Sequence, residues 1–269
     1  MNRTRLAAAV VAATTIVPTM LAVTTTAAQA ATYTATISVN PGPDGVGETG
    51  EPIRLTGTVK GGAVKGKKVT VYARFVGEPT WTKVSSPKLS SKGAWSSSYT
   101  PSYGGDTEFK VVKATSGKTK GVTKTSSSVK VFGWISEYSF RFEAAATPSD
   151  ALTRANGSIN GASYRGLVQV KDGGSVLYPL GAKDCDRVRG EVGVLDSSTD
   201  TSGKISLAYF FPFAEVGVAK QQDPVAFSTR VAPGSDVAIW STTGATNSVS
   251  TTSSMAFTDL AFHCNYHFN

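Results

Sequence analysis

The segment Val69-Thr70-Val71-Tyr72-Ala73-Arg74-Phe75 places an apolar or small residue at every second position. This period of two predicts a β-strand with one buried face. Comparable runs recur along the first half of the chain, where helical periodicity is nearly absent. They cover residues 33–39, 53–59, 81–84, 95–99, 109–111 and 127–131. About seven short strands in about 100 residues, separated by turns such as Gly61-Gly62, predict an immunoglobulin-like β-sandwich.

The second half of the chain has the same character. Strand-like runs cover residues 164–170, 188–194, 205–211, 225–231, 237–240 and 257–264. They predict a second, larger sandwich, for which a jelly roll is a common form. The composition changes near Phe132-Gly133-Trp134, so we place a domain boundary there. The expected fold is all-β, with an immunoglobulin-like sandwich at residues 31–132 and a jelly-roll-like sandwich at residues 133–269.

Residues 1–30 have the features of a secretory signal peptide. The start is basic, residues 6–23 are mostly apolar, and Ala28-Gln29-Ala30 offers a small-x-small cleavage site. A retained membrane anchor is the alternative, but Pro18 and several threonines weaken it. No later run approaches the ~18 apolar residues of a membrane span. We therefore expect a mature protein without a membrane span, located outside the cell and either free or associated with the cell wall.

Cys185 and Cys264 are the only cysteines. An oxidising environment outside the cell favours a disulfide between them, which would close a loop of about 80 residues. Two separate buried thiols are the alternative. Counting by twos from Cys264 gives an apolar face, whereas counting from Cys185 gives arginines. A turn or bulge between Cys185 and Val188 would reconcile the two strands, because it changes which side chains face inward.

Positive charge is concentrated in the first half of the chain. Residues 31–132 hold 15 Lys and Arg against 6 Asp and Glu, whereas residues 133–269 hold 10 against 13. Lysines in turns rich in Gly, Ser and Thr include Lys65, Lys67, Lys68, Lys118, Lys120 and Lys124. Two interpretations stay open, a solubilising surface and a surface that faces an anionic cell-wall polymer. Nucleic acid is not an expected partner, because no aromatic-basic motif accompanies the lysines.

Four segments of the second half follow one another in a characteristic order. They are Asn160-Gly161-Ala162-Ser163-Tyr164-Arg165-Gly166-Leu167, Tyr178-Pro179-Leu180-Gly181, Val192-Gly193-Val194-Leu195-Asp196 and Phe257-Thr258-Asp259-Leu260. In order and spacing, residues 134–264 resemble the NPCBM family of secreted β-sandwiches, which bind sugars and are often attached to glycoside hydrolases. The resemblance implies a carbohydrate-binding module. It also implies cysteines after the Tyr-Pro-Leu-Gly turn and at the end of the last strand, where Cys185 and Cys264 lie. In the first half, Trp81-Thr82-Lys83-Val84 and the following Gly93-Ala94-Trp95 resemble secreted bacterial immunoglobulin-like domains.

Several positions depart from the NPCBM pattern. Leu195 replaces an acid, Phe257 replaces a tryptophan, and Gln169 replaces a histidine that often follows the Gly-Leu element. Residues 242–254 also lack the acids and histidine common in the family. The fold therefore transfers better than the ligand.

The sequence shows no catalytic or metal-binding motif. The acidic residues considered for catalysis are Glu191, Asp196, Asp200, Glu215 and Asp259. Their spacing does not pair two carboxylates as glycoside hydrolysis requires. Residues 196–203 offer oxygens to a structural calcium ion, although an ordinary hairpin loop is the simpler interpretation. His263 and His267 lack a third zinc ligand, so we expect both to be surface residues. Because the sequence shows neither a carboxylate pair nor a metal motif, we expect the chain to be non-catalytic and without a cofactor.

Carbohydrate binding needs fewer precisely placed groups than catalysis or metal binding. An exposed ring covers the C–H face of a pyranose while polar neighbours bond its hydroxyls. The candidate binding residues are Trp240, Tyr164, Arg165, Asp196 and Asp259. Trp240 leads because alternation sets it opposite Val237 and Ile239. The favoured function is binding of an extracellular glycan or cell-wall polysaccharide; an adhesion protein with a degenerate carbohydrate-binding fold is the alternative, and a glycoside hydrolase is the least favoured.

Overall fold

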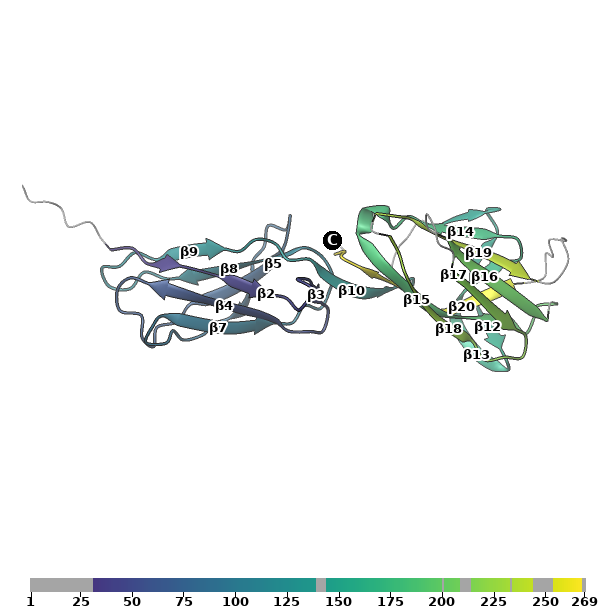
Figure 1. Cartoon of the computed structure of the whole chain (residues 1–269), viewed down its shortest axis with the longest axis horizontal. Coiled ribbons are helices and arrows are strands. Elements are labelled where there is room, and N and C mark those ends of the chain that lie inside the picture. Colours follow the sequence, from purple (N-terminus) through teal and green to yellow (C-terminus); the bar gives the residue numbers. More distant parts are fainter. Residues whose placement is uncertain are drawn as a thin grey trace, which may run out of the picture. The chain divides into compact units, whose positions relative to one another are not determined.

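A computed structural model describes residues 31–138, 144–199, 201–208, 214–232, 234–243 and 254–267, and these residues form an all-β structure (Figure 1). Four sheets account for the strands. The first holds β1 (Thr34–Ala35), β4 (Ile53–Lys60), β2 (Ser38–Asn40) and β7 (Ala94–Tyr99). The second holds β6 (Thr82–Ser85), β5 (Thr70–Phe75), β8 (Thr107–Lys113) and β9 (Val122–Thr125).

Two larger sheets follow along the chain. The seven-stranded sheet holds β12 (Leu152–Ile159), β13 (Ala162–Lys171), β20 (Ser254–Cys264), β10 (Val131–Ser136), β3 (Gly47–Glu48), β15 (Cys185–Val194) and β18 (Val225–Arg230). The five-stranded sheet holds β11 (Ala145–Thr147), β14 (Ser175–Tyr178), β19 (Val237–Thr243), β16 (Ser202–Ala208) and β17 (Ala214–Ala219). The described residues include no helix long and apolar enough to cross a membrane.

The two four-stranded sheets share one hydrophobic core. Ile53 and Leu55 from β4 meet Val71 from β5 and Phe109 from β8, all at 0% exposure. The alternation read from residues 69–75 is thereby confirmed, and the first sandwich is immunoglobulin-like in having two antiparallel sheets over a shared core.

One predicted strand of this half is wrong. Residues 127–131 do not form a strand of their own, because β9 ends at Thr125 and β10 begins at Val131. The Ser126 hydroxyl accepts a hydrogen bond from the Phe109 amide at 3.0 Å. A serine side chain that replaces a backbone ladder partner in this way ends regular pairing.

The seven-stranded and five-stranded sheets enclose a second core. Val168, Val192 and Phe262 from the first meet Val176 and Ile205 from the second. The predicted strands of this half are present, although residues 209–211 lie outside the described residues. The sequence did not predict strands β11, β12, β14 and β17. Strand β12 is mostly exposed and polar, so it lacks the alternation of apolar and polar residues that marks a half-buried strand.

Strand β10 contributes to both cores. Val131 is buried in the first core, while Ile135 packs against the second. The strand pairs with β3 in parallel and with β20 in antiparallel fashion. The domain boundary between residues 132 and 133 stays a prediction, and the strand runs across it without an intervening loop.

Strand β20 lies among β10, β13 and β15, and bulges on its flank set which side chains face inward. Between Cys185 and Arg187 strand β15 advances two residues while β20 advances one, so Asp186 is the extra residue. This bulge was predicted because counting by twos from the two cysteines gave different inward faces. A second shift between Arg189 and Glu191 places the extra residue on β20 near Asp259.

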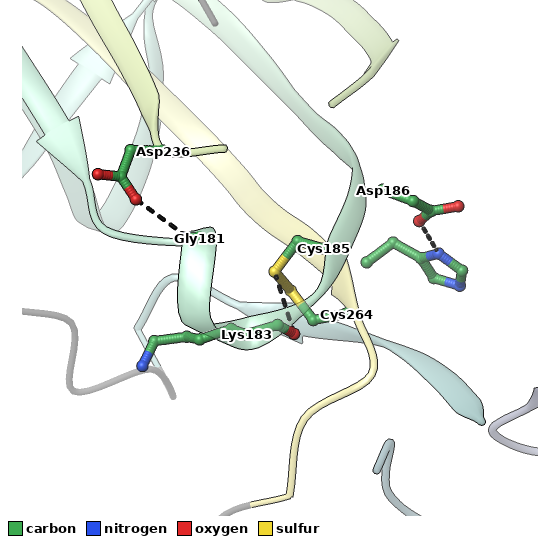
Figure 2. The surroundings of a disulfide bond; sticks show 7 residues. Gly181, Lys183, Cys185, Asp186, Asp236 and Cys264 are labelled. Carbon is green, nitrogen blue, oxygen red and sulfur yellow. Dashed lines mark hydrogen bonds and ion pairs between the residues drawn. A yellow bond between two sulfur atoms is a disulfide. The ribbon is translucent and has the colours of Figure 1, made fainter. Parts of the chain in front are cut away.

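Cys185 and Cys264 form a disulfide between adjacent strands (Figure 2). Both residues are buried, at 1% and 0% exposure. The short 3₁₀ turn Gly181–Lys183 precedes Cys185, and the Asp236 carboxylate accepts a hydrogen bond from the Gly181 amide at 2.9 Å (Figure 2). The disulfide therefore joins the start of β15 to the end of β20, and the prediction of one bond rather than two thiols is confirmed.

His263 on β20 contacts side chains from β3, β10 and the bulge in β15. Its Nδ1 is 2.5 Å from Asp186 Oδ1 and its Nε2 is 2.7 Å from Glu48 Oε2. The rings of Phe132 and Trp134 flank the imidazole, with centroids at 5.3 and 4.9 Å. The side chain is 2% exposed, so the expectation that His263 is a surface residue is wrong: an imidazole with a carboxylate at each nitrogen is satisfied in a buried position.

Removing the disulfide should destabilise the protein strongly. The variant Cys185→Ser with Cys264→Ser is expected to lose about 2–5 kcal/mol of the free energy of unfolding, because the bond restricts the unfolded chain over a sequence separation of 79. Urea unfolding of the oxidised protein and of the double variant measures the difference. Equal midpoints and equal slopes would show that the bond contributes nothing.

Candidate functional site

A hollow of about 530 Å³ lies over β10, β13 and β20 of the seven-stranded sheet. Its lining residues are Ser136, Glu137, Tyr138, Asn156, Tyr164, Arg165, Gly166, Val168, Phe257, Thr258, Asp259 and Leu260. A second hollow of about 510 Å³ shares Ser136 and Asp259 with the first. We call the two together the sheet groove. Two hollows that share lining residues can hold one extended ligand or two separate ones.

Arg165 reaches the groove from a bulge in β13. Ala155 pairs with Leu167 and Gly157 pairs with Tyr164, so β13 carries one extra residue between them. Gly166 has φ 66°, a left-handed conformation that suits glycine, and its amide donates to the Asn156 side-chain oxygen at 3.1 Å. The bulge turns the exposed Arg165 side chain into the groove wall.

Asp259 reaches the groove from the bulge in β20. Its φ of 52° is left-handed, a conformation in which Asp and Asn are enriched among non-glycine residues. Met255 and Phe257 belong to the second core before the bulge, and Leu260 and Phe262 belong to it after the bulge. At the bulge the alternation of inward and outward side chains shifts by one residue. The Asp259 side chain is left exposed on the outside, and it borders both hollows.

Tyr164 provides an aromatic wall that is held in place. Its ring is half-buried and packs on a small cluster formed by Ile159, Leu167, Leu195 and Ala256. These four residues are at most 4% exposed. A ring supported in this way loses little freedom when a ligand stacks on it, so it is pre-organised for binding.

The second hollow has a cation and an aromatic ring in contact. The Arg189 guanidinium lies 4.1 Å from the centroid of the Trp134 ring, within cation–π range. Glu191, from the same strand as Arg189, accepts a hydrogen bond from the Thr258 hydroxyl at 3.2 Å. This hollow therefore combines a ring, a positive charge and a carboxylate within one lining.

Glu137 is a buried acid in the lining of the first hollow. Its side chain is 2% exposed and is paired with Arg154, whose Nε is 3.3 Å from Oε2 and whose second nitrogen contacts Oε1. The hydrogen bond to Glu137 raises the pKa of Arg154. The Glu137 amide also donates to the Leu260 carbonyl at 2.8 Å, so the backbone at Glu137 is tied to β20 within the lining of the hollow.

The structure brings three of the five predicted binding residues together. Tyr164, Arg165 and Asp259 all line the first hollow. Trp240 is 39% exposed on β19 of the five-stranded sheet, opposite the buried Val237 and Ile239, and lines neither hollow of the groove. Its orientation matches the alternation, but its strand belongs to the other sheet.

Asp196 also lies outside the groove lining and supports a turn. It accepts a hydrogen bond from the Gly161 amide at 3.0 Å. Asn160 and Gly161 have φ of 49° and 79°, the left-handed pair of a two-residue hairpin between β12 and β13. The hydrogen bond from Gly161, with a further one from Ser158, holds the pKa of Asp196 below its usual value.

The metal predictions stay open. Asp200 of the candidate calcium loop lies outside the described residues. Among the residues that are described, no group of three or more His, Cys, Asp or Glu side chains is placed to hold a metal ion. His267 stacks on Phe75 with ring centroids 3.7 Å apart and is half-buried, whereas a surface position was expected.

Sequence reasoning did not include Trp134 and Arg189 among the binding residues. The two are in contact but lie far apart in the sequence and come from β10 and β15. Alternation through residues 131–136 does carry a signal, since it sets Trp134 and Ser136 on the face opposite Val131 and Ile135. That signal was missed because the strand was expected to end at residue 131.

Comparisons with known proteins give weak structural similarities. No family model and no curated protein matches the chain. Among solved structures, the chain is similar to the CBM51-2 and INT domains of ZmpB from Clostridium perfringens, with 12% identity, a TM-score of 0.40, and coverage of 61% of this chain and 38% of that one. It is also similar to the CBM51 of Clostridium perfringens GH95 in complex with methyl-galactose, with 14% identity, a TM-score of 0.36 and coverage of 48% and 99%.

A third similarity is to the secreted serine protease VesC from Vibrio cholerae, with 11% identity, a TM-score of 0.31 and coverage of 84% of this chain and 50% of that one. The similar structures therefore include carbohydrate-binding modules and a catalytic protein. Identities of 11–14% and these TM-scores are too low to transfer a site or a ligand.

The hydrogen bonds that the Asp196 carboxylate accepts in this turn should make part of the protein's stability depend on pH. A carboxyl with a lowered pKa in the folded state stabilises the protein above the pKa of the unfolded state, about 3.9, and this contribution is lost as the pH falls further. Asp196→Ala should therefore have a lower Tm than the natural protein at pH 6, and the difference should shrink below about pH 4. Thermal unfolding across pH 2–7 measures it. A difference that does not change with pH would contradict the role of the carboxylate.

Proposed function

We propose that this chain is a secreted, non-catalytic carbohydrate-binding protein whose ligand lies in the sheet groove. The observation that carries the proposal is the meeting of Tyr164, Arg165 and Asp259 in one hollow that adjoins the Trp134 and Arg189 hollow. The NPCBM-like motifs support the same function, since two of the four contribute these three residues. Secretion rests on the features of residues 1–30.

The chemistry of the groove suits a sugar. The half-buried ring of Tyr164 offers an apolar face for pyranose C–H groups. Arg165 and Asp259 are exposed beside it and can donate to and accept from hydroxyls. Trp134 offers a second ring in the adjoining hollow. A ring in each hollow favours at least a disaccharide unit of a longer chain as the ligand.

The carboxylates of the groove support a binding role rather than hydrolysis. Glu137 is paired with Arg154, and Glu191 accepts from Thr258. Hydrolysis needs one carboxyl that delivers a proton and one that attacks or activates water. In the described residues only Asp259 enters the groove as an exposed carboxylate without a recorded side-chain partner, and one such group does not make the required pair.

The experiment compares substitutions in the groove with a substitution on the other sheet. The full chain is tested on a glycan array and on insoluble cell-wall polysaccharides, with methyl-galactose and N-acetylglucosamine among the probes. Tyr164→Ala should weaken binding of whichever glycan is retained by about tenfold, because the stacking ring is lost. Asp259→Asn should also weaken binding while keeping the left-handed backbone, which Asn tolerates.

Trp240→Ala is the matched control for ring loss. It should leave the affinity within about twofold of the natural protein, since twofold is well under 1 kcal/mol. Loss of binding in Trp240→Ala with retention in Tyr164→Ala would move the site to the five-stranded sheet. Failure of the natural protein to bind any glycan would leave contacts with another protein as the function of this fold.

A further inference from the structure

The first sandwich has one end that is rich in lysine and holds none of its acidic residues. Antiparallel strands place the loops that follow β4, β6 and β8 at one end of the sandwich, together with the start of the described chain. Backbone contacts tie these loops together: the Leu89 amide donates to the Lys67 carbonyl at 2.7 Å, and the Tyr33 amide donates to the Lys120 carbonyl at 3.0 Å. Lys68 and Lys88 face each other in an isolated bridge. Figure 1 shows this end of the sandwich opposite β3.

Eight exposed lysines gather at this end. They are Lys60, Lys65, Lys67, Lys68, Lys88, Lys92, Lys118 and Lys120, and we call them the basic end. The loops that hold them are close, since the Val59 amide donates to the Gly93 carbonyl at 2.8 Å and the Tyr33 hydroxyl donates to the Ala63 carbonyl at 3.4 Å.

All six acidic residues of residues 31–132 lie towards the opposite end. They are Asp44, Glu48, Glu51, Glu78, Asp106 and Glu108. Contacts place them there: Glu108 pairs with Arg74 at 2.7 Å near the end of β5, and the Asp106 carbonyl accepts from the Val76 amide. None of the eight lysines therefore has an acidic neighbour within its own sandwich to neutralise it. A surface that serves only solubility has no need to sort its charges in this way, because interspersed charge of both signs keeps a domain soluble.

The composition of the basic end indicates the kind of ligand. All eight cations are lysines, which act as flexible point charges, whereas arginine provides the planar fork that reads one phosphate or carboxylate group. The exposed large apolar residues recorded for the described chain, Val76, Tyr103, Tyr138, Leu177 and Trp240, all lie outside these loops. Base stacking and insertion into a lipid surface both need such side chains.

We propose that the basic end is a second binding site, for a linear anionic polymer whose repeat units carry carboxylate, sulfate or phosphate groups. Many weak lysine contacts along such a chain release its counterions and add up to useful affinity. The polymer would be a different ligand from the sugar of the sheet groove. The two sites would then tether the protein to a charged matrix and a glycan independently.

The test uses the full chain and three polymers of defined chemistry, namely polygalacturonate, dextran sulfate and inorganic polyphosphate, with neutral dextran as the uncharged reference. The variant Lys65→Gln, Lys67→Gln, Lys88→Gln and Lys118→Gln removes four charges from three loops of the basic end. The control Lys83→Gln, Lys124→Gln, Lys130→Gln and Lys204→Gln removes four exposed charges elsewhere and has the same net charge. Thermal unfolding confirms that both variants are folded.

The natural protein should bind at least one anionic polymer and not neutral dextran. The basic-end variant should bind at least about tenfold more weakly at low salt, with a shallower dependence of affinity on salt concentration, while the control stays within about threefold. Equal weakening of both variants would overturn the proposal, since net charge alone would then explain binding. No binding to any of the three polymers would also overturn it. Duplex DNA and anionic vesicles are measured alongside them, and tighter binding to either would overturn it too, because the proposed ligand is a single-chain polymer that needs neither base stacking nor lipid. Tyr164→Ala should leave polymer binding unchanged, so this result stands apart from that of the groove.

Discussion

Strand β20 has to satisfy its backbone on both sides at once. It pairs with β15 along most of its length on one side, and with β13 and then β10 on the other. A buried strand cannot leave these donors and acceptors unpaired, so the seven-stranded sheet exists only when all three partners are in register. The Cys185–Cys264 disulfide secures one end of this arrangement, and the contacts of His263 with Asp186 and Glu48 lie beside it.

The irregularities of this sheet create the candidate site. A regular strand alternates its side chains strictly, so a face that covers a core cannot also present polar residues at will. The extra residues in β13 and β20 break that alternation and release Arg165 and Asp259 to the outside while the apolar positions continue to face the core. Bulges are common beside functional sites for this reason. The wall that supports Tyr164 is likewise a by-product of the hairpin between β12 and β13, which buries Ile159 and Leu195 against it.

Period-two patterning was enough to predict the all-β class and most strands, because those strands bury one face. It failed where burial does not set the pattern: β12 is largely polar, and the serines at 126–128 interrupt a run that looked continuous.

Within the site, Tyr164, Arg165 and Asp259 were found because their motifs are local. Arg189 was missed because its contact with Trp134 joins distant strands, which a single sequence does not reveal. Trp134 was missed because residues 131–136 were not recognised as a strand. Trp240 was predicted to be exposed and is, but exposure does not say which sheet a strand joins, and β19 belongs to the five-stranded sheet.

The placement of β20 also has a consequence for how the chain folds. Its partners β10, β13 and β15 are separated from it by long stretches of sequence, so the central pairing of the sheet is almost wholly non-local. Topologies dominated by such pairings fold slowly, because loop-closure entropy is lost before the contacts form. Until β20 inserts, β13, β15 and β10 present unpaired edges, and open edges invite pairing with other chains. The same strand that completes the groove therefore also governs how long these edges stay open to pairing with other chains.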